Sequence, residues 1–301
     1  MMGLQRQAAS NHVSAGPSMV QTTRFRPTRR PSLGAKVSVV VLLAALALLL
    51  AIGSAAAKCL PIAGLEPRVI PAALPAPGSL RLTFLGHSSF LIESAEGVAA
   101  VTDYNGWIRP PKRPDIVTMN NAHDTHYTDV VDPEIQLALR GWDPEGGMAV
   151  HEHQLRDLKV WNLPTNVRDY GGVRYNGNSI FVFEIADLCI AHLGHLHHLL
   201  SDEHLGQLGV IDVVLAPIDG AYTMAQELML EVIEQIGAPT VIPMHYFGNA
   251  TLARFLELAK PRYGAVFSKS SSIVLERGKL PYNKILVLPP RIDESRYYSD
   301  D

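Results

Sequence analysis

Histidines follow directly on three short apolar segments of this chain. DIVTM leads to His123 and His126, LCIAHLG leads to His195, and TVIPM leads to His245. Such runs, rich in branched apolar residues, are typical of strands buried in a sheet. In α/β sheets, side chains just past the carboxyl ends of the strands line the ligand crevice. The pattern therefore predicts several imidazoles gathered at one edge of a sheet.

Imidazole nitrogens suit zinc, manganese, iron and copper, and a histidine-rich set with one open position is typical of a catalytic metal site. A bound divalent ion lowers the pKa of its water ligand from 15.7 to about 7, so no serine or cysteine nucleophile is needed. The GHSSF segment lacks the G-x-S-x-G pattern of a serine nucleophile, and no glycine-rich phosphate loop follows a strand. A metal site is favoured over a polar turn that merely contains histidines.

The first 57 residues have the composition of a targeting segment. They contain six Arg or Lys and no Asp or Glu, followed by the apolar stretch 39–52 and by Ala55-Ala56-Ala57. A basic region, an apolar run and an A-x-A site predict a cleaved export signal, which leaves the protein periplasmic or otherwise extracytoplasmic. The alternative is an uncleaved membrane anchor over 37–57, with the domain outside the cytoplasm.

Residues 58–301 carry a formal charge of about −9, because 20 basic residues face 29 acidic ones. Nucleic acid is therefore not expected as a partner, since affinity for phosphate backbones comes from clustered Lys and Arg. We expect a small-molecule substrate, and the oligomeric state stays open. Cys59 lies at the start of this region and Cys189 lies in an apolar strand, so no structural disulfide is expected.

The pattern along the chain predicts an α/β domain over 80–290. A proline-rich lead-in (58–79) precedes it and a polar tail (291–301) follows it. Strand-like runs come first, and a helix is expected over 132–142 with Asp132 as its N-cap. From 201 onward, helix and strand patterns alternate. This order predicts mixed sheets covered by helices on the outside.

Six segments carry a resemblance to the metallo-β-lactamase superfamily, in particular to its branch similar to L-ascorbate-6-phosphate lactonase. They are LTFLGHSSFLIE, VTDY, DIVTMNNAHDTH, CIAHLGHLHH, IDVVLAPIDGAYTM and VIPMHY. The resemblance implies a four-layer αββα sandwich with mixed sheets and a hydrolytic site for one or two metal ions at its edge. It implies a metal-dependent hydrolase in which metal-activated water attacks an ester, lactone, amide or phosphodiester.

This chain departs from the family pattern at several positions. Thr125 stands in place of the Asp of H-x-H-x-D-H, with Asp124 one place earlier. Asn121 stands in place of the first histidine of H-x-H-x-D-H, Val167 in place of a later histidine, and His195 in place of the carboxylate that bridges two metals. The chain retains a ligand at His245. We therefore expect one divalent ion bound by His123, His126, His195 and His245, with zinc favoured and manganese or iron as alternatives.

The resemblance also assigns roles around this site. His123, His126 and Asp124 are the expected catalytic residues, with Asp124 as a fifth ligand or as a base. Side chains expected to hold the ligands or to contact substrate are Asp103, Asn121, Thr125, His87, His192 and Tyr246, although His192 also fits a buried core histidine. The alternative function is a catalytically decayed member that binds a metal or small ligand without turnover.

Overall fold

The computed structural model describes residues 74–291. The predicted export signal, residues 58–73 of the lead-in and residues 292–301 of the tail lie outside the described residues. Within 74–291, no helix is both long and apolar enough to cross a bilayer.

One mixed sheet has six strands in the order β13-β1-β2-β3-β4-β5. The bounds are β1 (Ser79–Gly86), β2 (Ser89–Glu93), β3 (Ala99–Val101), β4 (Ile116–Met119), β5 (Leu137–Arg140) and β13 (Ser272–Glu276). The strand β1 pairs antiparallel with β2 and β13, whereas β3, β4 and β5 run parallel. The sheet is therefore mixed, as the sequence predicts.

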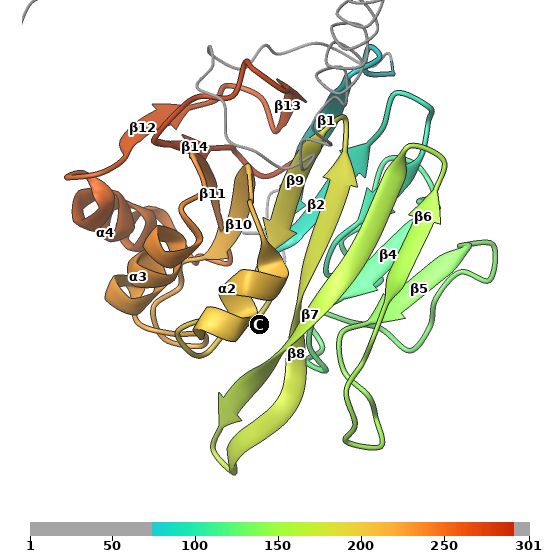
Figure 1. Cartoon of the computed structure of the whole chain (residues 1–301), viewed down its shortest axis with the longest axis horizontal. Coiled ribbons are helices and arrows are strands. Elements are labelled where there is room, and N and C mark those ends of the chain that lie inside the picture. Colours follow the sequence, from blue (N-terminus) through green and yellow to red (C-terminus); the bar gives the residue numbers. More distant parts are fainter. Residues whose placement is uncertain (1–73, 292–301) are drawn as a thin grey trace, which may run out of the picture. The chain divides into compact units, whose positions relative to one another are not determined.

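The second sheet has eight strands in the order β12-β14-β11-β10-β9-β8-β7-β6. The bounds are β6 (Glu152–Leu155), β7 (Leu158–Asp169), β8 (Gly172–Ile185), β9 (Leu188–His192), β10 (Val213–Pro217), β11 (Thr240–Met244), β12 (Gly264–Phe267) and β14 (Lys284–Val287). The strands from β9 to β12 are parallel, and β6 to β9 are antiparallel. The hairpin of β7 and β8 extends beyond the neighbouring strands (Figure 1).

The two sheets enclose one apolar core, and the three helices within residues 74–291 cover the outside of the larger sheet. Alternate residues of β10 show this, because Val213 and Leu215 belong to the core between the sheets, whereas Val214 and Ala216 belong to the core under the helices. The helices are α2 (Asp202–Leu208), α3 (Gln226–Ile236) and α4 (Asn249–Ala259), grouped beside β10 and β11 in Figure 1. The predicted α/β sandwich with mixed sheets is confirmed.

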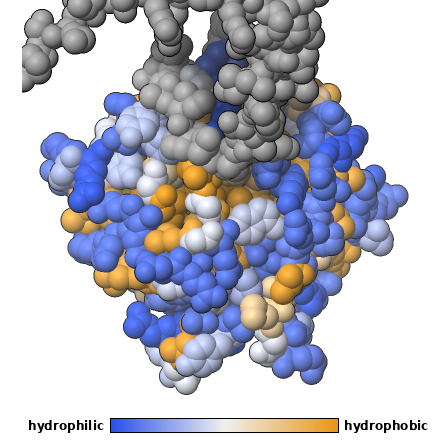
Figure 2. All heavy atoms as spheres, in the orientation of Figure 1, coloured by the Kyte–Doolittle hydropathy of each residue, from blue (hydrophilic) through white to orange (hydrophobic). Residues whose placement is uncertain are grey.

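Connecting segments cover the outer face of the six-stranded sheet in the described part of the chain. Leu91 and Val101 of this face pack with Ile108 and Ile135 from these connections. Hydrophilic side chains make up most of the surface seen in Figure 2, with smaller apolar areas between them. The apolar residues are thus largely enclosed within the layers.

Two expectations are wrong. The segment 132–142 contains strand β5 and no helix. Ile135, Leu137 and Leu139 are spaced two residues apart, a strand period, and pairing with β4 outweighs the N-cap signal at Asp132. The expectation that no disulfide forms is also wrong, because Cys189 is disulfide-bonded.

Amide side chains join the two sheets at the edge that carries the histidines. Asn120, just after β4, donates through Nδ2 to the carbonyls of Ser179 (2.7 Å) and His192 (3.3 Å) in the other sheet. Asn178 Oδ1 accepts from the His195 N–H at 2.8 Å. Gly194 fits between these amides because it has no Cβ and adopts a positive φ of 58°.

We expect Gly194→Ala to destabilise the domain by about 2–5 kcal/mol, from left-handed backbone strain and overpacking. An added Cβ would lie 2.5 Å from Asn120 Cβ and 2.6 Å from Asn178 Oδ1. The measurement is urea unfolding. Gly206→Ala in α2 is the control, because nothing lies within 4 Å of its added Cβ. Equal stabilities for the two variants would contradict this account.

Candidate metal centre

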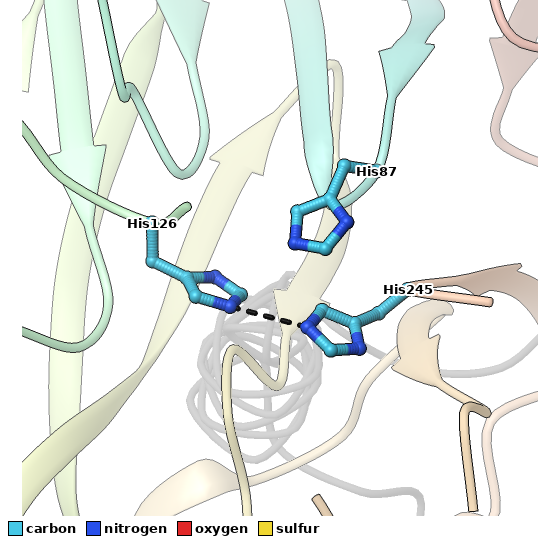
Figure 3. Close-up of side chains that lie close together, drawn as sticks. All are labelled: His87, His126 and His245. Carbon is cyan, nitrogen blue, oxygen red and sulfur yellow. Dashed lines mark hydrogen bonds between the residues drawn. The ribbon is translucent and has the colours of Figure 1, made fainter. Parts of the chain in front are cut away.

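Four histidines from both sheets meet at one end of the sandwich. His87 lies in the turn between β1 and β2, and His126 lies in the loop after β4. His195 follows β9 and His245 follows β11. Figure 3 shows the rings of His87, His126 and His245 turned toward one another. One ligand nitrogen from each of these three lies within 4.8 Å of the others.

The backbone is strained at three residues of this centre. The φ values are 52° at His87, 43° at Asp103 and 53° at His245, and residues other than glycine rarely adopt such values. Hydrogen bonds hold the turn at His87, because its carbonyl accepts from the His245 N–H at 2.7 Å and the Ser88 carbonyl accepts from His192 Nε2 at 2.7 Å. Such strain persists where the surroundings fix the conformation, and it clusters at functional sites.

A buried carboxylate orients His126. Asp103 Oδ2 accepts from His126 Nδ1 at 2.7 Å, and both side chains have 0% exposure. Burial would raise the pKa of the Asp103 carboxyl, but His126, His192 and the Asn120 N–H together hold it well below its usual range. The carboxyl is therefore ionised and can only accept, so His126 keeps its proton on Nδ1.

His245 is oriented in the same way by Asp219. Its Nδ1 lies 3.1 Å from Asp219 Oδ1, and that carboxylate has 1% exposure. Burial alone would raise the pKa of Asp219, but hydrogen bonds from His245, from Thr223 and from the Ala221 N–H hold it well below its usual range. Both imidazoles thus direct Nε2 into the centre.

The two Nε2 atoms lie 3.2 Å apart. With Nδ1 donating to a carboxylate, each neutral ring has a lone pair at Nε2, and two acceptors facing each other need a positive charge between them. Two nitrogens bound to one tetrahedral zinc at roughly 2.0–2.1 Å lie about 3.3–3.4 Å apart. The pair therefore fits a shared metal ion, and each carboxylate–histidine pair has the arrangement found at such ions.

Burial favours the neutral, ligand-competent form of the surrounding rings. It lowers the pKa of His87 to about 2 and also lowers the pKa of His126 and of His195. The His195 ring lies 4.9 Å from that of His126 and 5.2 Å from that of His245, between ring centroids. Its Nδ1 is 2.7 Å from His197 Nε2. His195 thus borders the three-histidine group.

Asn120, Asn121 and His126 of the NNAHDTH segment are buried, whereas the residues between them lie toward solvent. His123 has a side chain 58% exposed and contacts Thr125 Oγ1 at 2.9 Å. The Asp124 side chain is 90% exposed. Asn121 is buried and accepts from Arg174 Nη2 at 2.7 Å. The sequence pattern therefore placed the loop at the site but did not separate the inward-facing residues from the outward-facing ones.

Two further predicted residues lie behind the centre. His192 is fully buried, donates to the Ser88 carbonyl and accepts from the Gly194 N–H at 3.2 Å, as a satisfied core histidine does. Tyr246 packs against the core under the helices and lines a neighbouring cavity of about 590 Å³. Asp219 is the residue that the sequence analysis missed, although its position two residues after β10 matches the strand-end rule used for the histidines.

A cavity of about 830 Å³ opens over the centre. Five histidines line it, namely His87, His123, His195, His197 and His245. Its remaining lining residues are Asn121, Ala122, Thr125, Val167, Arg168, Tyr170, Arg174, Ala221, Tyr222, Thr223 and Phe247. This volume lies in the range of small-molecule sites, roughly 300–1,000 Å³.

We expect the metal-free protein to lose stability as the pH falls below about 6.5, the usual pKa of histidine. Burial lowers the folded-state pKa of His87, His126, His192 and His195, so below that pH the unfolded chain binds more protons. Each such histidine contributes up to ~1.4 kcal/mol per pH unit. Urea unfolding at pH 7.5, 6.5 and 5.5 measures this, and constant stability would contradict it.

The chain is similar to a known domain family, to curated relatives and to a solved structure. Residues 81–245 match the beta-lactamase superfamily domain. A UPF0173 metal-dependent hydrolase of Desulforamulus reducens is 28% identical over 193 residues, covering 56% of this chain and 84% of the relative. A UPF0173 metal-dependent hydrolase of Methanosphaerula palustris is 30% identical over 186 residues, covering 56% of this chain and 84% of that relative.

A structure from Thermotoga maritima, described as a metallo-β-lactamase superfamily protein, is 25% identical with a TM-score of 0.50. It covers 69% of this chain, and the match spans 98% of that protein. The superfamily domain spans more than half of this chain, and the predicted family is confirmed. The chain therefore belongs to the beta-lactamase superfamily.

Proposed function

We propose that this protein is a metal-dependent hydrolase whose divalent ion is held by His87, His126 and His245, with His195 as a fourth ligand. The observation that carries the proposal is the pair of Nε2 atoms 3.2 Å apart, each fixed by a buried carboxylate. The names of the relatives support it, since they are metal-dependent hydrolases, and the Thermotoga maritima protein is described as a candidate zinc-dependent hydrolase. Zinc is favoured, with manganese or iron as alternatives.

This ligand set differs from the set expected from the sequence by His87 in place of His123. The His87 ring is 4% exposed, and its centroid lies 4.3 Å from that of His245. His123 lines the cavity from the solvent side, where it can contact substrate. Asp124 does not line the cavity in the described residues, so a role as a base rests on its position in the sequence.

The residues of this chain fix the site before substrate arrives. Asp103 and Asp219 keep the protons of His126 and His245 on Nδ1, which leaves Nε2 free to bind an ion. A divalent ion bound there makes water acidic and polarises a carbonyl or phosphoryl oxygen. The hydrogen bond from the His245 N–H to the His87 carbonyl fixes the backbone of both residues, so the rings are in place without rearrangement. The substrate classes we propose are esters, lactones, amides and phosphodiesters, and the likeness to the ascorbate-phosphate lactonase branch stays a prediction.

We also propose that the domain works outside the cytoplasm, through export or through an anchor over 37–57. The basic, apolar and A-x-A segments of residues 1–57 support this. The disulfide at Cys189 fits the same compartment, since disulfides persist in oxidising surroundings.

The first test is the metal content of the full chain, with single variants. We expect about one ion per chain, and a loss of affinity of at least tenfold in His87→Ala and His245→Ala. His123→Ala should retain the ion, because His123 lies outside the three-histidine group. His153→Ala in β6 is the control. Loss of the ion in His123→Ala but not in His87→Ala would replace our ligand set by the one expected from the sequence.

Turnover is measured with the metal-loaded protein against ester, lactone, amide and phosphodiester substrates. Hydrolysis that stops on chelation supports the enzyme. An ion bound tightly without turnover of any of these classes would support the alternative, a decayed member that binds without catalysis.

A second test concerns the orienting carboxylates. We expect Asp103→Asn and Asp219→Asn to weaken metal binding by about 10–100-fold, because an amide no longer fixes the proton on Nδ1. Asp124→Asn makes the same change on an exposed side chain and should leave the affinity within twofold. Competition with a chelating dye measures all three. If all three variants bound the metal as tightly as the native protein, Asp103 and Asp219 would not orient the ligands.

A further inference from the structure

We propose that Arg168 and Arg174 form an anion-binding subsite, so that the substrate carries a carboxylate or phosphate group besides the bond that is hydrolysed. This inference rests on the proposed function and names its substrate class. Both arginines line the cavity over the metal centre, and both lie near the tip of the β7–β8 hairpin, which extends past its sheet (Figure 1).

The two arginines belong to neighbouring residue pairs of the β7–β8 hairpin. Arg174 is paired with Val167, and Arg168 with Val173. Val167 also lines the cavity, so an apolar residue stands at the site of a family histidine, in a cavity that Arg168 and Arg174 also line. Guanidinium binds carboxylate and phosphate oxygens through paired N–H groups, which makes arginine the residue suited to such anions.

The Arg174 side chain is held in place by neutral groups. Its Nη2 donates to Asn121 Oδ1 at 2.7 Å. Gly177 leaves room for it, since an added Cβ there would lie 2.6 Å from Arg174 Nε. An amide oxygen does not cancel the charge of the guanidinium, as a carboxylate would. Arg174 is thus held without a carboxylate partner among the described side chains, and its remaining N–H groups can donate to an anion.

The charge of the cavity contrasts with that of the chain. Among the side chains that the structure describes, two arginines and no Asp or Glu line the cavity. Among the described residues, no carboxylate forms an ion pair with Arg168 or Arg174. The whole chain carries a formal charge of −3. A bound divalent ion would add further positive charge, so an anionic substrate is attracted to this cavity specifically.

Aromatic side chains border the same cavity. Tyr222 is 66% exposed and Phe247 is 47% exposed, and their ring centroids lie 5.7 Å apart. Exposed aromatic rings beside fixed cations suit an organic molecule with an anionic group at one end. Inorganic anions would use only the arginines, whereas such a molecule contacts both.

The test uses the full chain, with and without zinc, and titration calorimetry. The probes are phenylphosphonate, benzoate as its carboxylate counterpart, and dimethyl phenylphosphonate as the neutral counterpart. We expect the native protein to bind at least one of the anions at least tenfold more tightly than the neutral probe, also without zinc. Comparing the two anions shows whether phosphate or carboxylate oxygens are preferred.

The double variant Arg168→Gln/Arg174→Gln should lose this preference, since charge-assisted hydrogen bonds typically contribute a factor of about ten or more. Arg254→Gln removes the same charge from α4, outside the cavity, and should keep the preference within twofold. Both variants alter exposed side chains, and thermal unfolding checks that they remain folded. Unchanged anion affinity in the double variant overturns the inference, as does a native protein that binds the neutral probe equally well.

These outcomes are separate from those of the hydrolase proposal. An anion preference that follows the arginines in a protein that binds none of zinc, manganese and iron would support the subsite and reject the hydrolase. Zinc-dependent turnover without any anion preference would reject the subsite and leave the hydrolase in place.

Discussion

The Nε2 lone pairs of His126 and His245 point at each other across 3.2 Å, so a positive charge is needed between them. The surrounding residues keep both Nε2 atoms unprotonated and in this position. Asp103 and Asp219 are buried and ionised, so His126 and His245 donate to them through Nδ1 and keep Nε2 unprotonated. Burying two carboxylates is costly unless each is hydrogen-bonded. The protein meets that cost with backbone N–H groups and imidazoles, and such carboxylate–histidine pairs are typical of sites that hold metal ions.

The sandwich supplies these partners from both sheets. The turn at His87 belongs to the six-stranded sheet, yet its carbonyl accepts from the His245 N–H at the end of a strand in the other sheet. Asn120 makes a similar connection to Ser179. Because hydrogen bonds across the edge fix both sheets, the strained backbone at the histidines is maintained by the whole fold.

The sequence predicted the elements better than the side-chain directions. Apolar strands ending in His126, His195 and His245 indicated the edge of the site, because strand ends are fixed by burial of the preceding residues. His87 received less weight, since a histidine in a tight turn has no periodic signal. Its direction depends on a left-handed backbone and on contacts with residues more than a hundred positions away.

The wrong helix over 132–142 has a related cause. A local N-cap signal at Asp132 favoured helix, whereas pairing of β5 with β4 is a long-range contact that a single segment does not reveal. Asp219 was missed because no histidine stood beside it to mark the strand end as functional. Both cases show that the sequence specifies burial locally, whereas the partner of a buried group is set by the fold.

The departures from the family pattern are consistent with one another. Asn121, Val167 and His195 each stand where a metal ligand is expected, and together they remove the imidazoles and the negative charge that a second cation would need. In the structure these positions serve other contacts. Asn121 holds Arg174, Val167 lies opposite Arg174 in the hairpin, and His195 contacts His197. The guanidinium of Arg174 thus lies beside Asn121, one of the positions where a ligand was expected. A fixed cation of this kind repels a metal ion and attracts an anion, which connects the loss of ligands to the binding of a charged substrate.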